Sequence, residues 1–220
     1  MVATAEVRWF FRGQAPARLA GWFEKVGAEP RQRADVYLRL PETDALGVKV
    51  RGGEGWLELK VREHAHGEQE LSGGVAGAVE QWRKWSFQRT AAEPPGHGLG
   101  LPPNCWVTVH KLRRLATYRP PDWSPSLEPA QGDGCNVELT DLRAGEPKGV
   151  GDEEWSTLGL EAFGSEETVL ESLSNAARAL FKDLDLPQGL HADLSCGYPG
   201  WLRHLARHLE RHLERHLDRE

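Results

Sequence analysis

The sequence predicts an α+β protein in which an antiparallel β-sheet closes on itself and carries helices on its outer surface. Seven segments alternate apolar and polar residues with a period of two, which is typical of antiparallel strands. Three further segments have features of helices. The polar faces of most of the strands carry charges of both signs, which a closed sheet would gather in its interior.

The predicted strands begin close to the N-terminus and recur along the chain. Their ranges are 3–11, 33–41, 46–51, 56–63, 105–118, 135–142 and 155–163. In 33–41, for example, Val36 and Leu38 fall on one face and Asp35 and Tyr37 on the other. The sequence GGEG between the third and fourth strands predicts that these two form a hairpin.

The three predicted helices cover 16–26, 74–87 and 165–184. Pro16 suits the first position of the first helix. The second segment is rich in small residues and has Trp82 and Trp85 three apart. The third shows apolar residues at helical spacing behind Ser165, a suitable N-terminal cap.

The chain is expected to form one domain over residues 1–202, followed by a helical tail rich in His and Arg over 203–220. Four histidines in the tail follow one another at intervals of four residues: His204, His208, His212 and His216. Neighbours at this spacing can bind a divalent metal on a helix. The alternative is a solvated helix that extends the domain.

Composition excludes several classes of function. A net charge of −6 argues against general affinity for nucleic acid. The three cysteines, Cys105, Cys135 and Cys196, form no CxxC pair, so neither a disulfide framework nor a zinc site is indicated. No stretch resembles a signal peptide or is long enough to span a bilayer, and we expect a cytoplasmic protein without a membrane partner.

The charged strand faces define the candidate site. They carry four acids, Glu6, Glu58, Glu138 and Glu161, and seven bases, Arg8, Lys49, Arg51, Lys60, Arg62, Lys111 and Arg113. Enclosed charges are costly unless they are hydrated, paired or bound to a charged ligand. Lys and Arg suit phosphate oxygens, whereas carboxylates suit Mg²⁺ or Mn²⁺. The alternative is an open sheet whose charged face lies in water.

Several residues lie beside these charged strand faces and need separate interpretation. Val107 and Val109 share a strand face with Lys111 and Arg113, so we expect a bulge to separate the two pairs. Lys84 is interpreted as a surface lysine between packed tryptophans, and His110 as a packed or solvent-facing histidine rather than a proton shuttle. Asp35 and Tyr37 are not assigned to the site.

The order of these motifs resembles the CYTH, or triphosphate tunnel metalloenzyme, superfamily. The resemblance rests on VYLRLPETDALGVKVR, WLELKVR, VTVHKLRR, VELTDL and LGLEAFG, and spans roughly residues 3–184. It implies an antiparallel tunnel that binds a triphosphate with Mg²⁺ or Mn²⁺. Phosphate ligands would be Arg8, Lys49, Arg51, Lys60, Arg62, Lys111 and Arg113, metal ligands would be Glu6, Glu58, Glu138 and Glu161, and catalytic residues would be Glu58, Lys60 and Glu161.

The chain departs from the signature of that superfamily at two places. The E-x-E-x-K of the first strand reads Thr4, Glu6, Arg8, and the E-x-E of the last strand reads Gly159, Glu161. Fewer carboxylates predict a weaker metal site. Two functions therefore stay open: a metal-dependent hydrolase of an inorganic or organic triphosphate, and a weakly active or inactive module that binds polyphosphate, a nucleotide or a protein partner.

Overall fold

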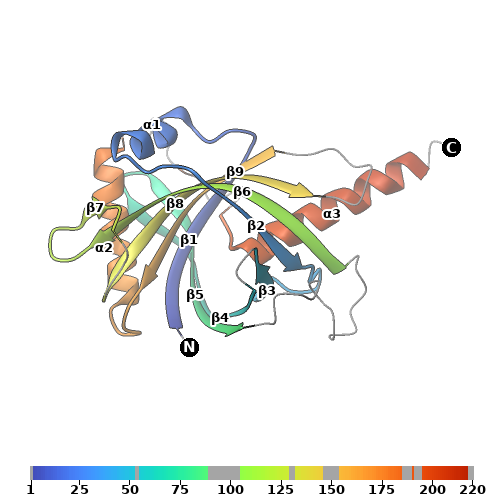
Figure 1. Cartoon of the computed structure of the whole chain (residues 1–220), viewed down its shortest axis with the longest axis horizontal. Coiled ribbons are helices and arrows are strands. Elements are labelled where there is room, and N and C mark those ends of the chain that lie inside the picture. Colours follow the sequence, from blue (N-terminus) through green and yellow to red (C-terminus); the bar gives the residue numbers. More distant parts are fainter. Residues whose placement is uncertain are drawn as a thin grey trace.

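The protein is a closed antiparallel barrel, seen in a computed structural model that describes residues 2–52, 55–88, 105–128, 132–145, 154–184, 190 and 195–217, the last ten by their backbone alone. Eight strands form the closed sheet in the order β2-β3-β4-β5-β1-β9-β8-β6, and β6 pairs back onto β2. A short strand, β7, extends the edge beside β6 (Figure 1). The predicted fold class is confirmed.

The strands agree closely with the predicted segments, except that β4 is longer than predicted and that β5 and β7 were not predicted as strands. Their bounds are β1 Val2–Arg12, β2 Arg31–Leu38, β3 Leu46–Arg51, β4 Trp56–Ser72, β5 Val75–Gln88, β6 Trp106–Arg119, β7 Ser124–Ser126, β8 Gly134–Gly145 and β9 Glu154–Phe163. The helices are α1 Ala17–Lys25, α2 Val169–Asp183 and α3 Tyr198–Leu217. β3 and β4 pair as the predicted hairpin.

The helix predicted over 74–87 is wrong, because this segment is strand β5. β5 pairs along its whole length with β4, which runs nine residues beyond its predicted end. Gly73 and Gly74 both have positive φ, 46° and 84°, as the turn of a two-residue hairpin requires. Pairing on both sides, with β4 and β1, overrides the local preference of the small residues.

The outer faces of five strands lie under two helices. α1 contacts β6 and β8, and α2 contacts β1, β4, β6, β8 and β9. This outer core contains Trp9 and Leu160 from the barrel, Trp22 from α1 and Leu180 from α2. Because the apolar faces are buried outside, the charged faces of the same strands point into the barrel. The alternative of a charged face in open water is therefore wrong.

A second, smaller core fills one end of the barrel interior. It combines inward-facing residues such as Phe10 and Val109 with Trp201 and Leu202 from the start of α3. The ring of Trp201 stacks on Phe10 at 5.2 Å. The first turn of α3 therefore closes this end of the tunnel from within, and the rest of the helix runs outward past the barrel (Figure 1).

The bulge expected in β6 is absent, because Trp106 to Arg113 pair without interruption with Leu38 to Arg31 of β2. Val107 and Val109 are therefore true interior residues and belong to the closed end. The segments 89–104, 129–131 and 146–153, which connect consecutive strands, lie outside the described residues. In the part of the chain that the structure describes, no helix is both long and apolar enough to cross a membrane.

Candidate functional site

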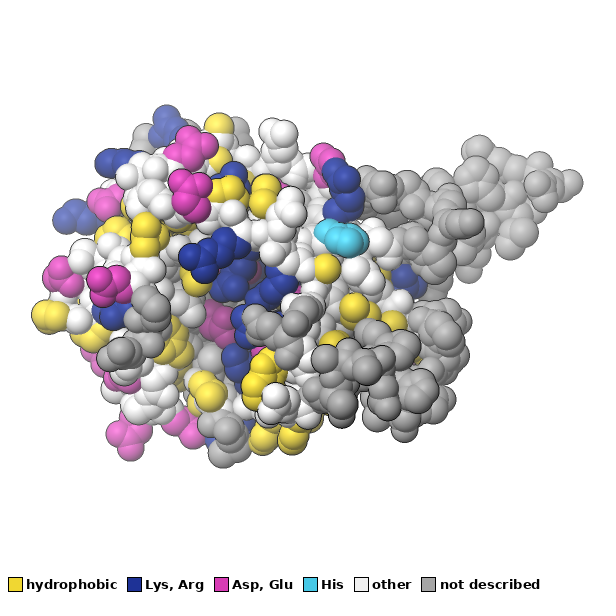
Figure 2. All heavy atoms as spheres, in the orientation of Figure 1, with side chains coloured by type: hydrophobic (Ala, Val, Ile, Leu, Met, Phe, Trp, Pro, Cys, Tyr) yellow, Lys and Arg dark blue, Asp and Glu magenta, His cyan; other side chains and the backbone are white. Residues whose placement is uncertain are grey.

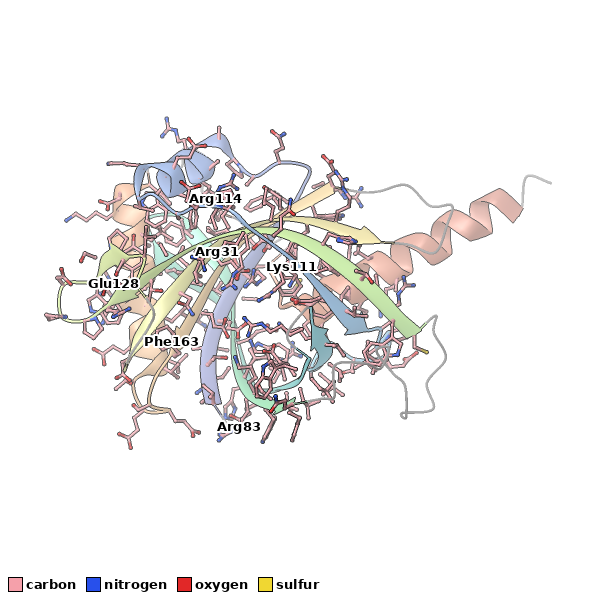
Figure 3. The ribbon with its side chains drawn as sticks, in the orientation of Figure 1. Arg31, Arg83, Lys111, Arg114, Glu128 and Phe163 are labelled. Carbon is pink, nitrogen blue, oxygen red and sulfur yellow. The ribbon has the colours of Figure 1, made fainter. Side chains whose placement is uncertain are left out.

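The barrel interior contains a cavity of about 250 Å³ that is lined mainly by charged side chains. Eight of the lining residues are Lys or Arg and four are Glu, an excess of four positive charges. Figure 2 shows blue and magenta side chains gathered at a hollow near the centre of one face. In Figure 3, Lys111 lies near the centre of the barrel, whereas Arg83 and Glu128 lie at its periphery.

Ten of the eleven predicted site residues line this cavity. The eleventh, Arg62, does not line it and instead donates hydrogen bonds to Glu80 at 2.6 Å and Asp44 at 2.8 Å. The cavity also brings in six polar residues that the sequence did not place in the site: Arg33, Tyr37, Thr43, Lys84, Asn136 and Tyr198. The alternation of side chains along β2 would have predicted Arg33 as a site residue, because Arg33 lies on the same face of the strand as Asp35 and Tyr37.

Glu138 of β8 lies between two arginines from different strands. It is 3.2 Å from Arg8 of β1 and 2.5 Å from Arg113 of β6, and it accepts a hydrogen bond from Thr140. Burial opposes ionisation of Glu138, but the charges of Arg8 and Arg113 outweigh burial and hold its pKa well below the usual range. Glu138 therefore fixes both guanidinium groups at the cavity wall.

Glu58 of β4 holds a second pair of bases. Its carboxylate is 2.9 Å from Lys49 and 3.4 Å from Arg51, both on the neighbouring strand β3. Burial raises the pKa of Glu58, but the combined effect of Lys49, Lys84 and Arg51 outweighs burial and lowers the pKa below its usual value. Glu58 is thus ionised at neutral pH and fully engaged with basic side chains.

Asp35 of β2 is the most enclosed carboxylate, with no exposure to solvent. Lys111 donates hydrogen bonds to it at 2.9 Å and to the hydroxyl of Tyr37 at 2.6 Å. Arg33 lies 3.0 Å and Lys49 3.7 Å from the same carboxylate. Burial opposes ionisation of Asp35, but Lys111, Lys49 and Arg33 outweigh it and keep its pKa low. Asp35 therefore organises the bases behind the cavity wall.

Glu6 and Glu161 share a single cation, the ammonium group of Lys60. The two glutamates are directly opposite each other on β1 and β9. Lys60 of β4 contacts the carboxylate of Glu6 and lies 3.5 Å from that of Glu161. The charge of Lys60 lowers the pKa of Glu161 to about 2. Burial lowers the pKa of Lys60 itself despite its acidic neighbours.

Lys84 of β5 faces the cavity opposite Lys60 rather than the outer surface. Among the residues that the structure describes, it makes no hydrogen bond or ion pair, although its charge helps to lower the pKa values of Glu58 and Glu161. A lysine without a partner in a cavity already rich in positive charge is available to an anionic ligand.

The carboxylates of the cavity leave one position that could hold Mg²⁺ or Mn²⁺. In the described part of the chain, no three acidic, His or Cys side chains come together as a metal site. Glu58 and Glu138 are each paired with two bases. Glu6 and Glu161 point toward one position, which the ammonium group of Lys60 occupies in this structure. Mg²⁺ in phosphate-binding sites commonly uses one or two carboxylates together with phosphate oxygens and water. Glu6 and Glu161 fit that requirement.

Comparisons with known proteins identify similar folds only. No family model and no curated protein matches the chain. A conserved hypothetical protein from Pyrococcus furiosus is similar over 87% of this chain and 94% of its own, with 14% identity and a TM-score of 0.42. The PH1012 protein of Pyrococcus horikoshii is similar over 86% and 93%, with 16% identity and a TM-score of 0.38.

A third similar structure is HpAC1 of Hippeastrum, which is described as having a dominant triphosphatase activity. It matches over 83% of this chain and 87% of its own, with 9% identity and a TM-score of 0.36. The barrel described above is the fold that the resemblance to the CYTH superfamily implies.

Proposed function

We propose that the protein binds a triphosphate in its tunnel and hydrolyses it with the help of Mg²⁺ or Mn²⁺. The observation that carries the proposal is the charge of the cavity, where eight bases face four acids. Each of the four acids already has a basic partner. Asp35, behind the cavity wall, offsets one of the four surplus positive charges through Lys111, Arg33 and Lys49. The rest of the surplus is uncompensated, and a compact polyanion is the ligand that would compensate it.

The bases would act by holding the phosphate chain and stabilising the charge that develops during phosphoryl transfer. Arg8 and Arg113 are held in place by Glu138, and Lys49 and Arg51 by Glu58, so little reorganisation is needed at the moment of reaction. Lys84 and Lys60 face them from neighbouring strands. Arginine side chains in this setting can bind two phosphate oxygens at once.

Glu6 and Glu161 would hold the divalent cation at the remaining wall. When bound, such an ion neutralises phosphate charge and lowers the pKa of a coordinated water. Lys60 would then turn from the two carboxylates toward the phosphates, since both positions lie within reach of a flexible four-carbon side chain. The low pKa of Glu161 keeps it ionised and ready for the metal at neutral pH.

A second candidate function is binding without turnover. It is favoured by the engagement of Glu58 and Glu138 with two bases each, which leaves only one carboxylate pair for a metal. Such a protein would retain a triphosphate, polyphosphate or nucleotide and report its presence to a partner.

Phosphate release from inorganic triphosphate, ATP and thiamine triphosphate separates the two functions. Each substrate is tested with Mg²⁺, with Mn²⁺ and with EDTA, on the wild type and on Lys60→Ala. Metal-dependent release that is lost in the variant supports the hydrolase. No release, together with a rise in melting temperature on adding triphosphate, supports the binding module. No release and no thermal shift would refute both.

A further inference from the structure

Part of the cavity wall is apolar rather than charged. Six apolar residues line it: Leu38, Leu40, Leu46, Val48, Pro199 and Leu202. They come from β2, β3, the connection between these strands, and the first turn of α3. A phosphate chain gains nothing from leucine and proline, so this part of the cavity has no role in holding a bare polyanion.

This apolar wall is built from ordered parts. Asp44, in the connection between β2 and β3, is held by Arg62 at 2.8 Å and by Arg203 of α3 at 2.7 Å. Within the same connection, the backbone N–H of Ala45 donates to the hydroxyl of Thr43 at 3.1 Å. The connection is therefore tied both to the barrel and to the helix that closes it.

The wall is also incompletely covered by the protein itself. Leu38, Leu40, Leu46 and Val48 are only half-buried, in contrast to the fully buried side chains of the outer core. Half-exposed leucines that line a cavity gain free energy when a ligand covers them, because apolar surface then leaves water. The wall is thus suited to an apolar group.

Tyr198 lies where the apolar and charged parts meet. Arg8 and Lys111 approach its ring to 4.8 Å and 4.1 Å, and the ring stacks on Tyr37 at 5.6 Å. Its hydroxyl is buried and has no hydrogen-bond partner within the described residues. A buried hydroxyl without a partner is costly, and a polar atom of a ligand would remove that cost.

We propose that the apolar wall holds the organic group of a triphosphate ester, so that the preferred ligand carries a small ring rather than being inorganic triphosphate. This inference rests on the proposed binding of triphosphate in the tunnel. The phosphate chain would lie along the Lys and Arg residues, and the ring against Leu40, Leu46 and Leu202. A polar atom between them would reach the hydroxyl of Tyr198.

The sharpest test compares methyl triphosphate with phenyl triphosphate, which have the same charge and differ in the apolar group alone. Inorganic tripolyphosphate serves as the third ligand. Dissociation constants are measured by calorimetry on the full chain, with EDTA present so that a metal-dependent reaction does not consume the ligands. We expect phenyl triphosphate to bind about tenfold more tightly than the methyl ester, as burial of one ring would provide.

Two variants test whether the apolar wall causes the preference for the phenyl ester. Leu40→Asp should reduce the phenyl-to-methyl ratio to near one, and because its carboxylate repels the phosphates it should also weaken the binding of both esters. Leu40→Ala, which places no charge in the cavity, should reduce the ratio in the same direction. Leu127→Asp is the matched control, since Leu127 is 53% exposed and does not line the cavity, and it should keep the wild-type ratio.

The outcomes separate this inference from the function on which it rests. Binding of all three ligands with equal affinity for the two esters would overturn the inference and leave triphosphate binding intact. A wild-type preference that survives both changes at Leu40 would also overturn it. If none of the three ligands binds, both the inference and the proposed function fail.

Discussion

The guanidinium group of Arg8 lies directly over Gly159, its partner on the adjacent strand. A Cβ at position 159 would come within 2.4 Å of the guanidinium carbon. On the other side of Gly159 lies Glu138, whose carboxylate Arg8 reaches across the glycine. The two departures from the superfamily signature, Arg for Lys at 8 and Gly for Glu at 159, are therefore coupled: the larger base occupies the space that the acid would need.

This coupling predicts a non-additive pair of substitutions. Gly159→Glu alone should cost roughly 2 kcal/mol of unfolding free energy, because the new side chain overlaps Arg8 in an enclosed site. Arg8→Lys together with Gly159→Glu should recover much of that loss, because the shorter, thinner lysine makes room. Urea unfolding of the wild type, both single variants and the double variant measures the coupling. Simple additivity of the two changes would contradict the account.

Asp35 is expected to be important for stability rather than for ligand contact. Asp35→Asn would leave Lys111, Lys49 and Arg33 close together without their shared counter-charge, and should cost about 3 kcal/mol. Chemical denaturation measures the effect. Asp141→Asn, whose 3.4 Å pair with Arg114 is much more exposed, is the control and should change stability by less than about 1 kcal/mol. Equal losses of stability in the two variants would show that Asp35 contributes no more to stability than an exposed ion pair.

The interior carboxylates predict loss of stability in acid. The pKa values of Asp35, Glu58, Glu138 and Glu161 are all lowered in the folded state, that of Glu161 to about 2. A depressed pKa contributes stability above the unfolded value near 4, and the contribution is lost as pH falls toward the folded value. The free energy of unfolding should thus be nearly constant from about pH 8 to 6 and decline below about pH 5.

Unfolding titrations at pH 7, 5 and 3 test this expectation, with Glu161→Gln as the variant of interest. The variant should show a shallower decline than the wild type, because one of the four linked carboxylates is gone. Stability that rises between pH 5 and 3 would be the opposite of what the ion pairs require.

Lys60 should compete with a divalent cation for Glu6 and Glu161. Lys60→Gln removes the competing ammonium group and should raise the affinity for Mn²⁺, measured alone by calorimetry, about tenfold. Lys84→Gln is the control. It removes the same charge from the same cavity, but in the described structure Lys84 contacts neither carboxylate. If both substitutions raise the affinity equally, net charge rather than the specific contact governs metal binding.

Strand periodicity predicted the antiparallel sheet and most of its charged face, whereas the closure of the sheet into a barrel rested also on the resemblance to the CYTH superfamily. Alternation placed Glu58, Lys60 and Glu161 on inward faces because a period of two admits only two sides of a strand. The same rule applied to Arg33 and Lys84 would have added both, but Lys84 lay in the segment that the small residues and the Trp spacing favoured as a helix.

The parts that could not be predicted depend on contacts between distant segments. The closure of one tunnel end by Trp201 and Leu202 depends on where α3 begins relative to the barrel, which local sequence does not specify. The apolar wall has the same origin, since Leu40 and Leu202 meet only because that helix enters the interior. The identity of the bases that pair with each acid likewise depends on register between strands.

The central claim, that the tunnel binds a triphosphate through its surplus positive charge, is tested most directly by titrating tripolyphosphate into the wild type and Lys84→Ala. Lys84 is the best choice because its removal leaves no acid without a partner in the described structure, so the fold should be unaffected. Lys182→Ala, at the end of α2, is the matched surface control. We predict one binding site per chain, weakened about tenfold by Lys84→Ala and unchanged by Lys182→Ala. No binding to the wild type, or equal affinity in all three proteins, would contradict the account.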